Sequence, residues 1–404
     1  MWRRTLAGGP ADQVLIDLGT STITGLCAPG APELAKTVHW VGHPVLQTLA
    51  LDTSDTAALG SSFSRAGLLY ERPPVTDDVF TDRFGVDWLS AEGSAAPLNH
   101  PLQGADYLQV ARHPRPIWPD TLQVPDIDSS DPGRPLIVAD APTAGLLETC
   151  FGLRDTWQFM LDITDNWRVA NALLDWALES VASAYEHMFA RLPISPDVVI
   201  YGDDYGYQGG MFLSDNDFRS FVRPRLRTLF SRIRRATSAA ICFHCCGAIQ
   251  PILTDLADLG VEILNLQYDA KGMELHNVRA ELPREVVLHG YTDLCALGKS
   301  VVTGERRGIA VLTEELIASA PVIAAPVDNL ASEADLMYAA AGARFVLELT
   351  PDDIEQIRQI GPVKSILDRA TEAALSRPIA RPTGSPPIAT SIHSDAATVP
   401  QLAR

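Results

Sequence analysis

A histidine and two cysteines occupy consecutive positions in the segment ICFHCCGAIQ, residues 241–250. His244 and Cys246 are two residues apart at the end of an apolar run, so in an extended segment both side chains leave the same face. An imidazole nitrogen and a thiolate sulfur are both preferred ligands of zinc in proteins. Cys242 and Cys245 read more simply as small buried apolar side chains, the usual environment of a free cysteine. The pattern therefore predicts a metal site at His244 and Cys246.

Other polar residues follow other short apolar runs in the same way. These runs, at 136–139, 198–201, 239–243, 261–264, 286–289 and 321–324, alternate with longer segments whose apolar residues recur at helical spacing. Such alternation predicts parallel strands joined by helices. The polar residues at or just after the ends of the runs, in addition to His244 and Cys246, are Asp203, Asp204, Gln208, Asn265, Gln267, His289, Asp293, Asp328 and Asn329.

A (β/α)8 TIM barrel explains this placement economically, because the carboxyl ends of all its strands open on one face and share one site. In that site we expect Asp203, Asp204 and His289 to be catalytic. The remaining polar residues are expected to bind substrate: Gln208, Asn265, Gln267, Asp293 and Asn329. A doubly wound open sheet is the alternative fold, and it would gather the loops at one switch point instead.

Simpler interpretations exist for several of these residues. Asp203 and Asp204 lie between glycines and could serve only a turn, since Asp and Gly are common turn residues. Asn265 and Gln267 taken alone are typical of loops. His289, at a strand end, could be a core histidine whose hydrogen bonds are satisfied within the protein.

The domain organisation follows from the same patterns. Residues 1–135 are predicted to form an elaborated N-terminal cap region that includes the first barrel strand, near Val14–Ile16. Residues 136–375 form the main body of the barrel, in which the stretch 155–190 is expected to contain two helices meeting near Asn166. Residues 376–404 are rich in Pro, Ser, Thr and Ala and are predicted to be a disordered tail.

Composition excludes several classes of partner. The net charge of −18 and the lack of a long basic cluster argue against nucleic acid. No apolar run approaches the length of a membrane helix, and the N-terminus lacks an apolar signal core. Six cysteines in 404 residues, three of them within 242–246, are expected to be thiols in a reducing compartment. A cytoplasmic protein with a small-molecule substrate is the expectation.

Several segments, in order, resemble one known family. The stretch FHCCGAIQPILTDLADLGVEILNLQ is similar to the His-x-Cys-Gly segment of the uroporphyrinogen decarboxylase superfamily, in the branch of zinc-dependent, cobalamin-linked methyltransferases. YGDDYGYQGGMFLSDNDFRSFVRPRLRTLF resembles that branch's Gly-Asp-Asp-x-Gly-x-Gln segment, and VLIDLGTSTITGL and VFTDRFGVDWL look like further pieces. The resemblance spans about residues 12–375 and implies a (β/α)8 barrel, the URO-D domain.

The resemblance also implies a ligand set. His244 and Cys246 would be two Zn²⁺ ligands, with a third cysteine expected after a late strand. Here Val327 stands at that position. Asp328, next to it, could supply a carboxylate ligand instead, and Cys295 is another candidate. One thiolate, one imidazole and one carboxylate form a possible zinc site that is less thiophilic than a site with two thiolates.

Two reactions fit this family. The first is metal-assisted methyl transfer between a corrinoid and a thiol or related small acceptor, in which zinc holds the thiol as thiolate. No corrinoid-binding Asp-x-His-x-x-Gly segment occurs, so cobalamin would arrive free or on a separate corrinoid protein. The alternative is cofactor-free decarboxylation of a carboxylated small molecule, although the Arg-Gln-Ala-Gly-Arg-Tyr signature of true uroporphyrinogen decarboxylases is missing. A catalytically retired ligand-binding barrel is a third possibility.

Overall fold

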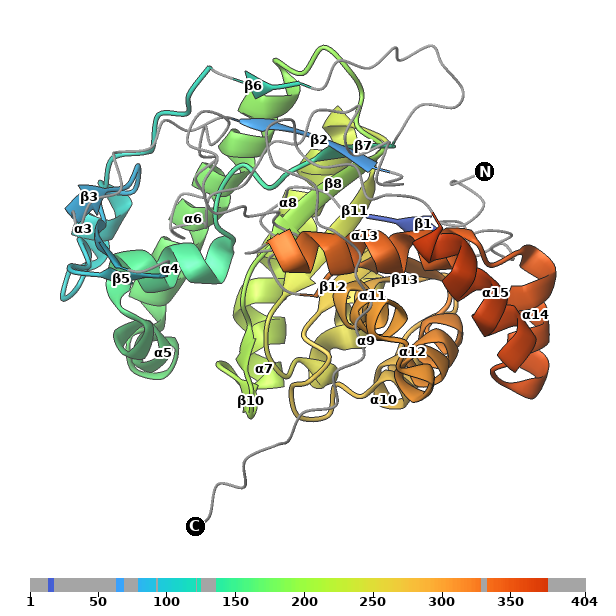
Figure 1. The fold of residues 1–404 in the computed structure, drawn as a ribbon. Helices are drawn as coiled ribbons and strands as arrows, with labels where there is room; N and C mark the ends of the chain where they lie inside the picture. The colour runs from blue at the N-terminus through green and yellow to red at the C-terminus, as the bar shows by residue number, and fades with distance from the viewer. Residues whose placement is uncertain are drawn as a thin grey trace.

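A computed structural model of the chain describes residues 14–17, 63–68, 79–91, 94–120, 122–124, 136–327 and 333–376. Its centre is a nine-stranded sheet with the order β1-β14-β13-β12-β11-β8-β7-β2-β6 (Figure 1). The strands are β1 (Leu15–Ile16), β2 (Phe63–Leu68), β6 (Leu122–Gln123), β7 (Leu136–Ala139), β8 (Val198–Gly202), β11 (Ala240–Cys245), β12 (Ile263–Leu266), β13 (Val287–Asp293) and β14 (Val322–Ala325). All neighbours pair in parallel except β2 with β6.

The predicted parallel strands are confirmed, with small shifts at their ends. The N-terminal region differs from its prediction, because it supplies two parallel strands to this sheet rather than one: β1 pairs with β14, and β2 pairs with β7. Strand order follows chain order from β2 to β14 and then returns to β1, as in a ring opened at one joint. Among the residues that the structure describes, no pairing joins β1 to β2.

The sheet is curled, so that side chains on its inner face contact one another across the sheet. Alternate residues of the strands leave this inner face. Side chains from strands as far apart in the sheet as β7 and β14 meet there in a single buried cluster: Leu136, Val138, Val198, Ile200, Ala240, Cys242, Ile263, Val287 and Ile323. A curled parallel sheet with an apolar inner face is the arrangement of a TIM-like fold.

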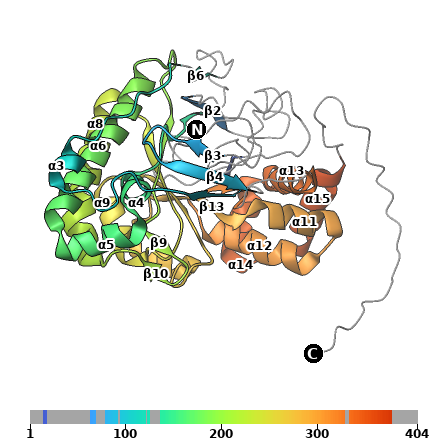
Figure 2. The ribbon, with the colours of Figure 1, turned by 90° about the vertical axis from the view of Figure 1, so that its left-hand side faces the viewer.

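Helices cover the outer face of the sheet in two groups (Figures 1 and 2). The first group consists of α4 (Leu146–Arg154), α5 (Thr156–Asp165), α6 (Trp167–Phe189), α8 (Arg223–Ala236), α9 (Leu253–Asp258) and α10 (Leu275–Glu281). The second group consists of α11 (Leu294–Thr303), α12 (Arg306–Ala318), α13 (Glu333–Leu347), α14 (Pro351–Ile360) and α15 (Lys364–Leu375). The predicted pair of helices in 155–190 is confirmed, since α5 and α6 meet at Asn166.

Smaller elements complete the described chain. A separate antiparallel sheet contains β3 (Val79–Thr81), β4 (Asp87–Ala91) and β5 (Ser94–Pro97), and the short helix α3 (Tyr107–Ala111) follows it. The hairpin β9 (Gly206–Tyr207) and β10 (Gly210–Met211) follows β8. Between that hairpin and α8 lie α7 (Asp215–Asp217) and the π-helix η1 (Phe218–Val222), while the 3-10 turn η2 (Gln250–Ile252) precedes α9.

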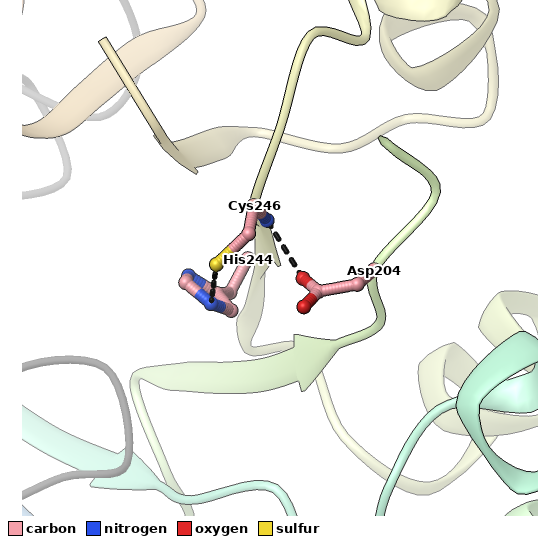
Figure 3. A group of neighbouring side chains, drawn as sticks. All are labelled: Asp204, His244 and Cys246. Atoms are coloured by element: carbon pink, nitrogen blue, oxygen red, sulfur yellow. Dashed lines mark hydrogen bonds between the residues drawn. The ribbon is translucent and has the colours of Figure 1, made fainter. Parts of the chain in front are cut away.

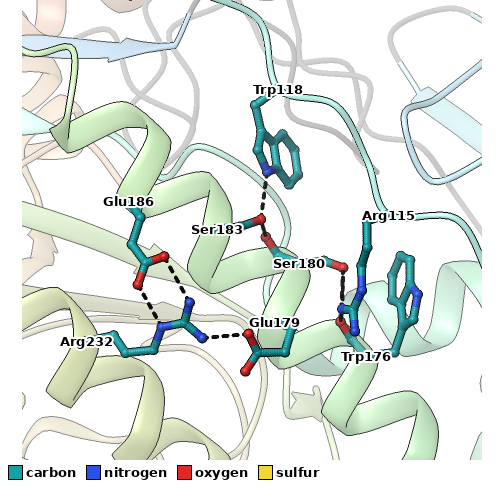
Figure 4. Close-up of polar contacts among 8 residues, drawn as sticks. All are labelled: Arg115, Trp118, Trp176, Glu179, Ser180, Ser183, Glu186 and Arg232. Atoms are coloured by element: carbon teal, nitrogen blue, oxygen red, sulfur yellow. Dashed lines mark hydrogen bonds and ion pairs between the residues drawn. The ribbon is translucent and has the colours of Figure 1, made fainter. Parts of the chain in front are cut away.

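Polar side chains fasten α6 to its surroundings (Figure 4). Arg232 of α8 binds both carboxylate oxygens of Glu186 at 2.8 and 2.9 Å and reaches Glu179 at 2.9 Å. On another side of α6, Arg115 lies over the Trp176 ring at 5.1 Å, and Trp118 donates to Ser183. These contacts hold the 115–118 segment against the helix.

A buried ion pair connects α4 with α5. Arg154 and Asp162, with side chains only 2% and 8% exposed, meet at 2.7 Å. Arg154 also donates to the carbonyl oxygens of Leu102 and Ala105.

In the described part of the chain, no helix is both long and apolar enough to cross a membrane. The predicted tail lies outside the described residues apart from Ser376, which follows α15.

Candidate metal centre

The inner face of the sheet changes from apolar to polar toward the carboxyl ends of its strands. In a strand, a side chain two residues after another points to the same face of the sheet. Residues two positions after the inner-face cluster, or after Leu15 that packs against it, therefore also face inward. This step leads from Cys242 to His244, from Ile263 to Asn265, from Val287 to His289 and from Leu15 to Asp17. In a parallel barrel this end of the sheet carries the active site.

Asp204, His244 and Cys246 converge at this end and together could hold a metal ion. Their donor atoms, one from each side chain, all lie within 4.8 Å of one another. Cys246 Sγ lies 3.6 Å from His244 Nε2, and Asp204 Oδ1 accepts a 2.7 Å hydrogen bond from the Cys246 backbone N–H. Figure 3 shows the Cys246 sulfur next to the His244 ring at the end of β11, with the Asp204 carboxylate reaching toward them from the segment after β8. All three are partly exposed.

The thiol of Cys246 is held in its protonated form in this environment. Burial raises the pKa of Cys246, and the nearby Asp204 carboxylate raises it further. A divalent cation would reverse this balance, because it would compensate the negative charges on both sulfur and carboxylate. The chemistry of the donor set thus fits a bound cation.

His244 has a buried polar support behind it. Its Nδ1 lies 2.6 Å from Asn265 Oδ1, and Asn265 Nδ2 lies 2.8 Å from His289 Nδ1. His289 Nε2 in turn lies 2.9 Å from Asp17 Oδ2. Asn265, His289 and Asp17 are buried. Asp17 was missed in the sequence, although its two-residue step from Leu15 places it on the inner face.

Asp203, which follows β8, points to the opposite face of the sheet from Asp204, His244 and Cys246. On β8 the inner-face residues are Val198 and Ile200, so Asp203 continues the outer-face row of Val199 and Tyr201. Its carboxylate accepts hydrogen bonds from Tyr201 Oη at 2.7 Å and from the backbone N–H groups of Leu147 and Glu148 at 3.0 Å. Asp203 therefore caps the N-terminus of α4.

Burial, with the nearby Glu148 carboxylate, raises the pKa of Asp203 to about 7, against the opposing effect of the two N–H donors. The Asp pair, adjacent in sequence, is thus divided between two tasks. Asp204 belongs to the group of candidate metal ligands, and Asp203 contacts the N-terminus of α4. The catalytic role predicted for Asp203 stays a prediction.

The other predicted substrate-binding residues are spread over the same loops. Gln267 accepts a hydrogen bond from the Gly247 N–H at 2.7 Å and so supports the loop after Cys246. Asp293 caps α11 through the N–H of Cys295, and the Gln208 side chain is exposed. Asp328 and Asn329, predicted to bind metal and substrate, lie outside the described residues. Cys242 and Cys245 are buried, as expected of apolar cysteines.

Comparison with known proteins agrees with this architecture. Residues 151–319 match the family model for uroporphyrinogen decarboxylase (URO-D). This segment of the chain is similar to the URO-D family. The URO-D match runs from α4 through α12 and includes His244, Cys246, Asn265 and His289.

A solved structure of a methyltransferase from Methanosarcina mazei is similar in fold to this chain. The TM-score is 0.55 and the sequences are 18% identical, over 84% of this chain and 96% of that chain. At this identity the likeness concerns the fold. The search of curated proteins found no match to this chain. The resemblance predicted from the sequence is confirmed at the level of the superfamily.

Proposed function

We propose that this protein catalyses metal-assisted methyl transfer to a small acceptor, with Asp204, His244 and Cys246 as the protein's metal ligands. The convergence of these donor atoms within 4.8 Å carries the proposal. The fold likeness to a methyltransferase agrees with it. In this proposal Asp204 supplies the carboxylate ligand, while the ligand role predicted for Asp328 stays a prediction because Asp328 lies outside the described residues.

Each ligand has a distinct task in this proposal. His244 offers Nε2, Cys246 offers its sulfur, and Asp204 offers one carboxylate oxygen. The other Asp204 oxygen continues to accept the hydrogen bond from the Cys246 backbone N–H. Zinc, with its preference for nitrogen, sulfur and oxygen donors in one site, is the metal we propose. When bound, it would supply a positive charge that keeps an acceptor thiol deprotonated near neutral pH.

The methyl donor in this proposal is a corrinoid. Since the sequence holds no Asp-x-His-x-x-Gly segment, the corrinoid would come from a separate protein or from solution. The decarboxylase alternative gains no comparable support, because Asp203, an acid it would use, is engaged with the end of α4. We further propose that β1 and β2 meet to close the (β/α)8 ring and that the rest of the N-terminal region caps it.

Metal analysis of the purified protein tests the proposal, with adjacent cysteines as a matched pair. Wild type should hold about one equivalent of zinc. His244→Ala and Cys246→Ala should lose it, whereas Cys245→Ala should retain it because Cys245 is buried away from the cluster and donates to the Cys246 carbonyl. Wild type should also demethylate methylcobalamin in the presence of a thiol, followed by visible absorbance. Wild-type protein that takes up no zinc, or a Cys246→Ala variant that keeps it, would overturn the assignment.

A further inference from the structure

A single buried amide, that of Asn265, connects the two histidines of the inner face. It lies on β12, between His244 of β11 and His289 of β13, and the strand register places the three residues side by side. Its Nδ2 lies 2.8 Å from His289 Nδ1 and 3.1 Å from the His289 carbonyl oxygen, while its Oδ1 lies 2.6 Å from His244 Nδ1.

The carbonyl contact fixes which way the amide points. A carbonyl oxygen only accepts hydrogen bonds, so the Asn265 atom facing it must be the NH₂ group. The same NH₂ group then donates its second hydrogen to His289 Nδ1, which must carry a lone pair. On the opposite side, the amide oxygen accepts from His244 Nδ1, which must carry a hydrogen.

We infer that Asn265 holds the two histidines in opposite neutral tautomers and thereby prepares His244 as a ligand. With its hydrogen on Nδ1, His244 presents a lone pair on Nε2, the atom that lies 3.6 Å from the Cys246 sulfur. His289 has its hydrogen on Nε2 and donates it to the buried Asp17 carboxylate at 2.9 Å. Asn265, His289 and Asp17 are therefore positioning residues for His244.

This arrangement also connects the Asp17 carboxylate to the proposed ligand His244 through His289 and Asn265. The Asp17 side chain is 2% exposed and that of His289 is 6% exposed, so little water screens the hydrogen bond between them. The Asp17 carboxylate accepts a hydrogen bond from the His289 ring, and the Asn265 amide oxygen accepts one from the His244 ring. Both hydrogen bonds make His244 Nε2 a stronger electron donor. The effect on metal affinity rests on the proposed function, whereas the tautomers are a property of the metal-free protein.

Nitrogen NMR on the full-length, metal-free protein with ¹⁵N-labelled histidine tests the tautomers directly. His244 should give a pyrrole-type nitrogen at Nδ1 and a pyridine-type nitrogen at Nε2, and His289 should give the reverse. Spectra of His244→Gln and His289→Gln assign the two rings among the nine histidines. A His244 ring with its hydrogen on Nε2 would overturn the inference, and this measurement needs no substitution at Asn265.

Two substitutions of Asn265 separate positioning from general loosening of β12. Asn265→Leu should free His244 from its single tautomer and weaken zinc binding by about 10- to 100-fold. Asn265→Asp should keep an acceptor for His244 Nδ1 and hence its tautomer and zinc affinity, while His289 loses its donor and changes its nitrogen spectrum. Ile263→Val, on the same inner face two residues earlier, is the control and should change neither.

The outcomes distinguish this inference from the proposed function. If the two histidines show opposite tautomers but the protein takes up no zinc, the inferred role of Asn265 in fixing the tautomers stands and the metal proposal is refuted. Wild-type zinc binding that is unchanged in Asn265→Leu would keep the metal proposal and refute the positioning role.

Discussion

Gly247 lies directly against Gly206, with no room for a side chain between them. A Cβ on Gly247 would come within 2.2 Å of the Gly206 carbonyl carbon and 2.4 Å of the Tyr207 backbone nitrogen. The backbone of Gly247 also has φ +83°, which a residue with a Cβ rarely adopts. The segment that follows Cys246 is thus pressed onto the hairpin that follows Asp204, and this contact brings the two proposed ligands together.

Gly247→Ala should therefore damage the proposed metal site as well as the fold. We expect a loss in the free energy of unfolding greater than the about 1–2 kcal/mol that left-handed backbone costs alone, because the hairpin must also move. Zinc affinity should fall with it. Gly104→Ala is the control, since Gly104 has φ +70° and nothing lies within 4 Å of its Cβ position. Equal losses in the two variants, measured by denaturant unfolding, would contradict the role assigned to the contact.

The two adjacent aspartates should respond differently to the same change. Asp204→Asn removes a charged ligand and should weaken zinc binding by more than the about 10- to 100-fold typical of outer partners. Asp203→Asn should leave zinc binding close to wild type and lower the stability of the protein by about 1 kcal/mol, because the amide NH₂ group replaces one of the two oxygens that accept hydrogen bonds there. Competition with a chromogenic chelator measures the first effect, and thermal unfolding measures the second. Loss of zinc from Asp203→Asn would place both acids in the centre.

The Arg154–Asp162 pair should be sensitive to removal of one partner. Asp162→Asn leaves a buried guanidinium without its compensating charge, and we expect a loss of about 3–5 kcal/mol. Glu355→Gln makes the matched change in the pair with Arg358, whose side chains are 53% and 44% exposed. Because water screens that exposed pair, the variant should shift the unfolding midpoint much less than Asp162→Asn. Denaturant midpoints compare the two, and similar shifts would show that burial does not decide the outcome.

The contact between Arg232 and Glu186 should make a small, pH-dependent contribution to stability. Hydrogen bonds from Arg232 lower the pKa of Glu186 below its usual value. Because the folded pKa is the lower one, the stabilisation is present above the unfolded pKa of about 4.3 and is lost as the pH falls through the folded value. Glu186 is 48% exposed, so we expect only about 0.2–1 kcal/mol.

Glu186→Gln tests this dependence. The difference in free energy of unfolding between wild type and the variant should shrink between about pH 6 and pH 3. A difference that grows over this interval would mean that the carboxylate is not stabilised by Arg232.

Much of the fold was predictable because its strands are short apolar runs with clear helical segments between them. The runs at 198–201 and 286–289 illustrate this, since β8 and β13 begin within one residue of them. The place of β2 was not predictable, since its sequence FSRAGL has neither an apolar run nor strict alternation. Only pairing with β7 shows its role.

The candidate metal site was predictable in part for the same reason. His244 and Cys246 stand out by their spacing, and the structure adds Asp204 to them. The distinction between Asp203 and Asp204 is also present in the sequence, because Val198 and Ile200 set which positions face inward. Asp17 could not be assigned a partner in advance, since its contact with His289 spans 272 residues.

That long span has a consequence for synthesis of the protein. β1 is synthesised long before its neighbour β14, which is complete only at Ala325. Pairing between strands so far apart in the sequence is slow. The nascent chain is thus exposed to wrong strand pairing until β14 has been made, and chaperones that shield unpaired strands should raise the yield of protein able to take up zinc.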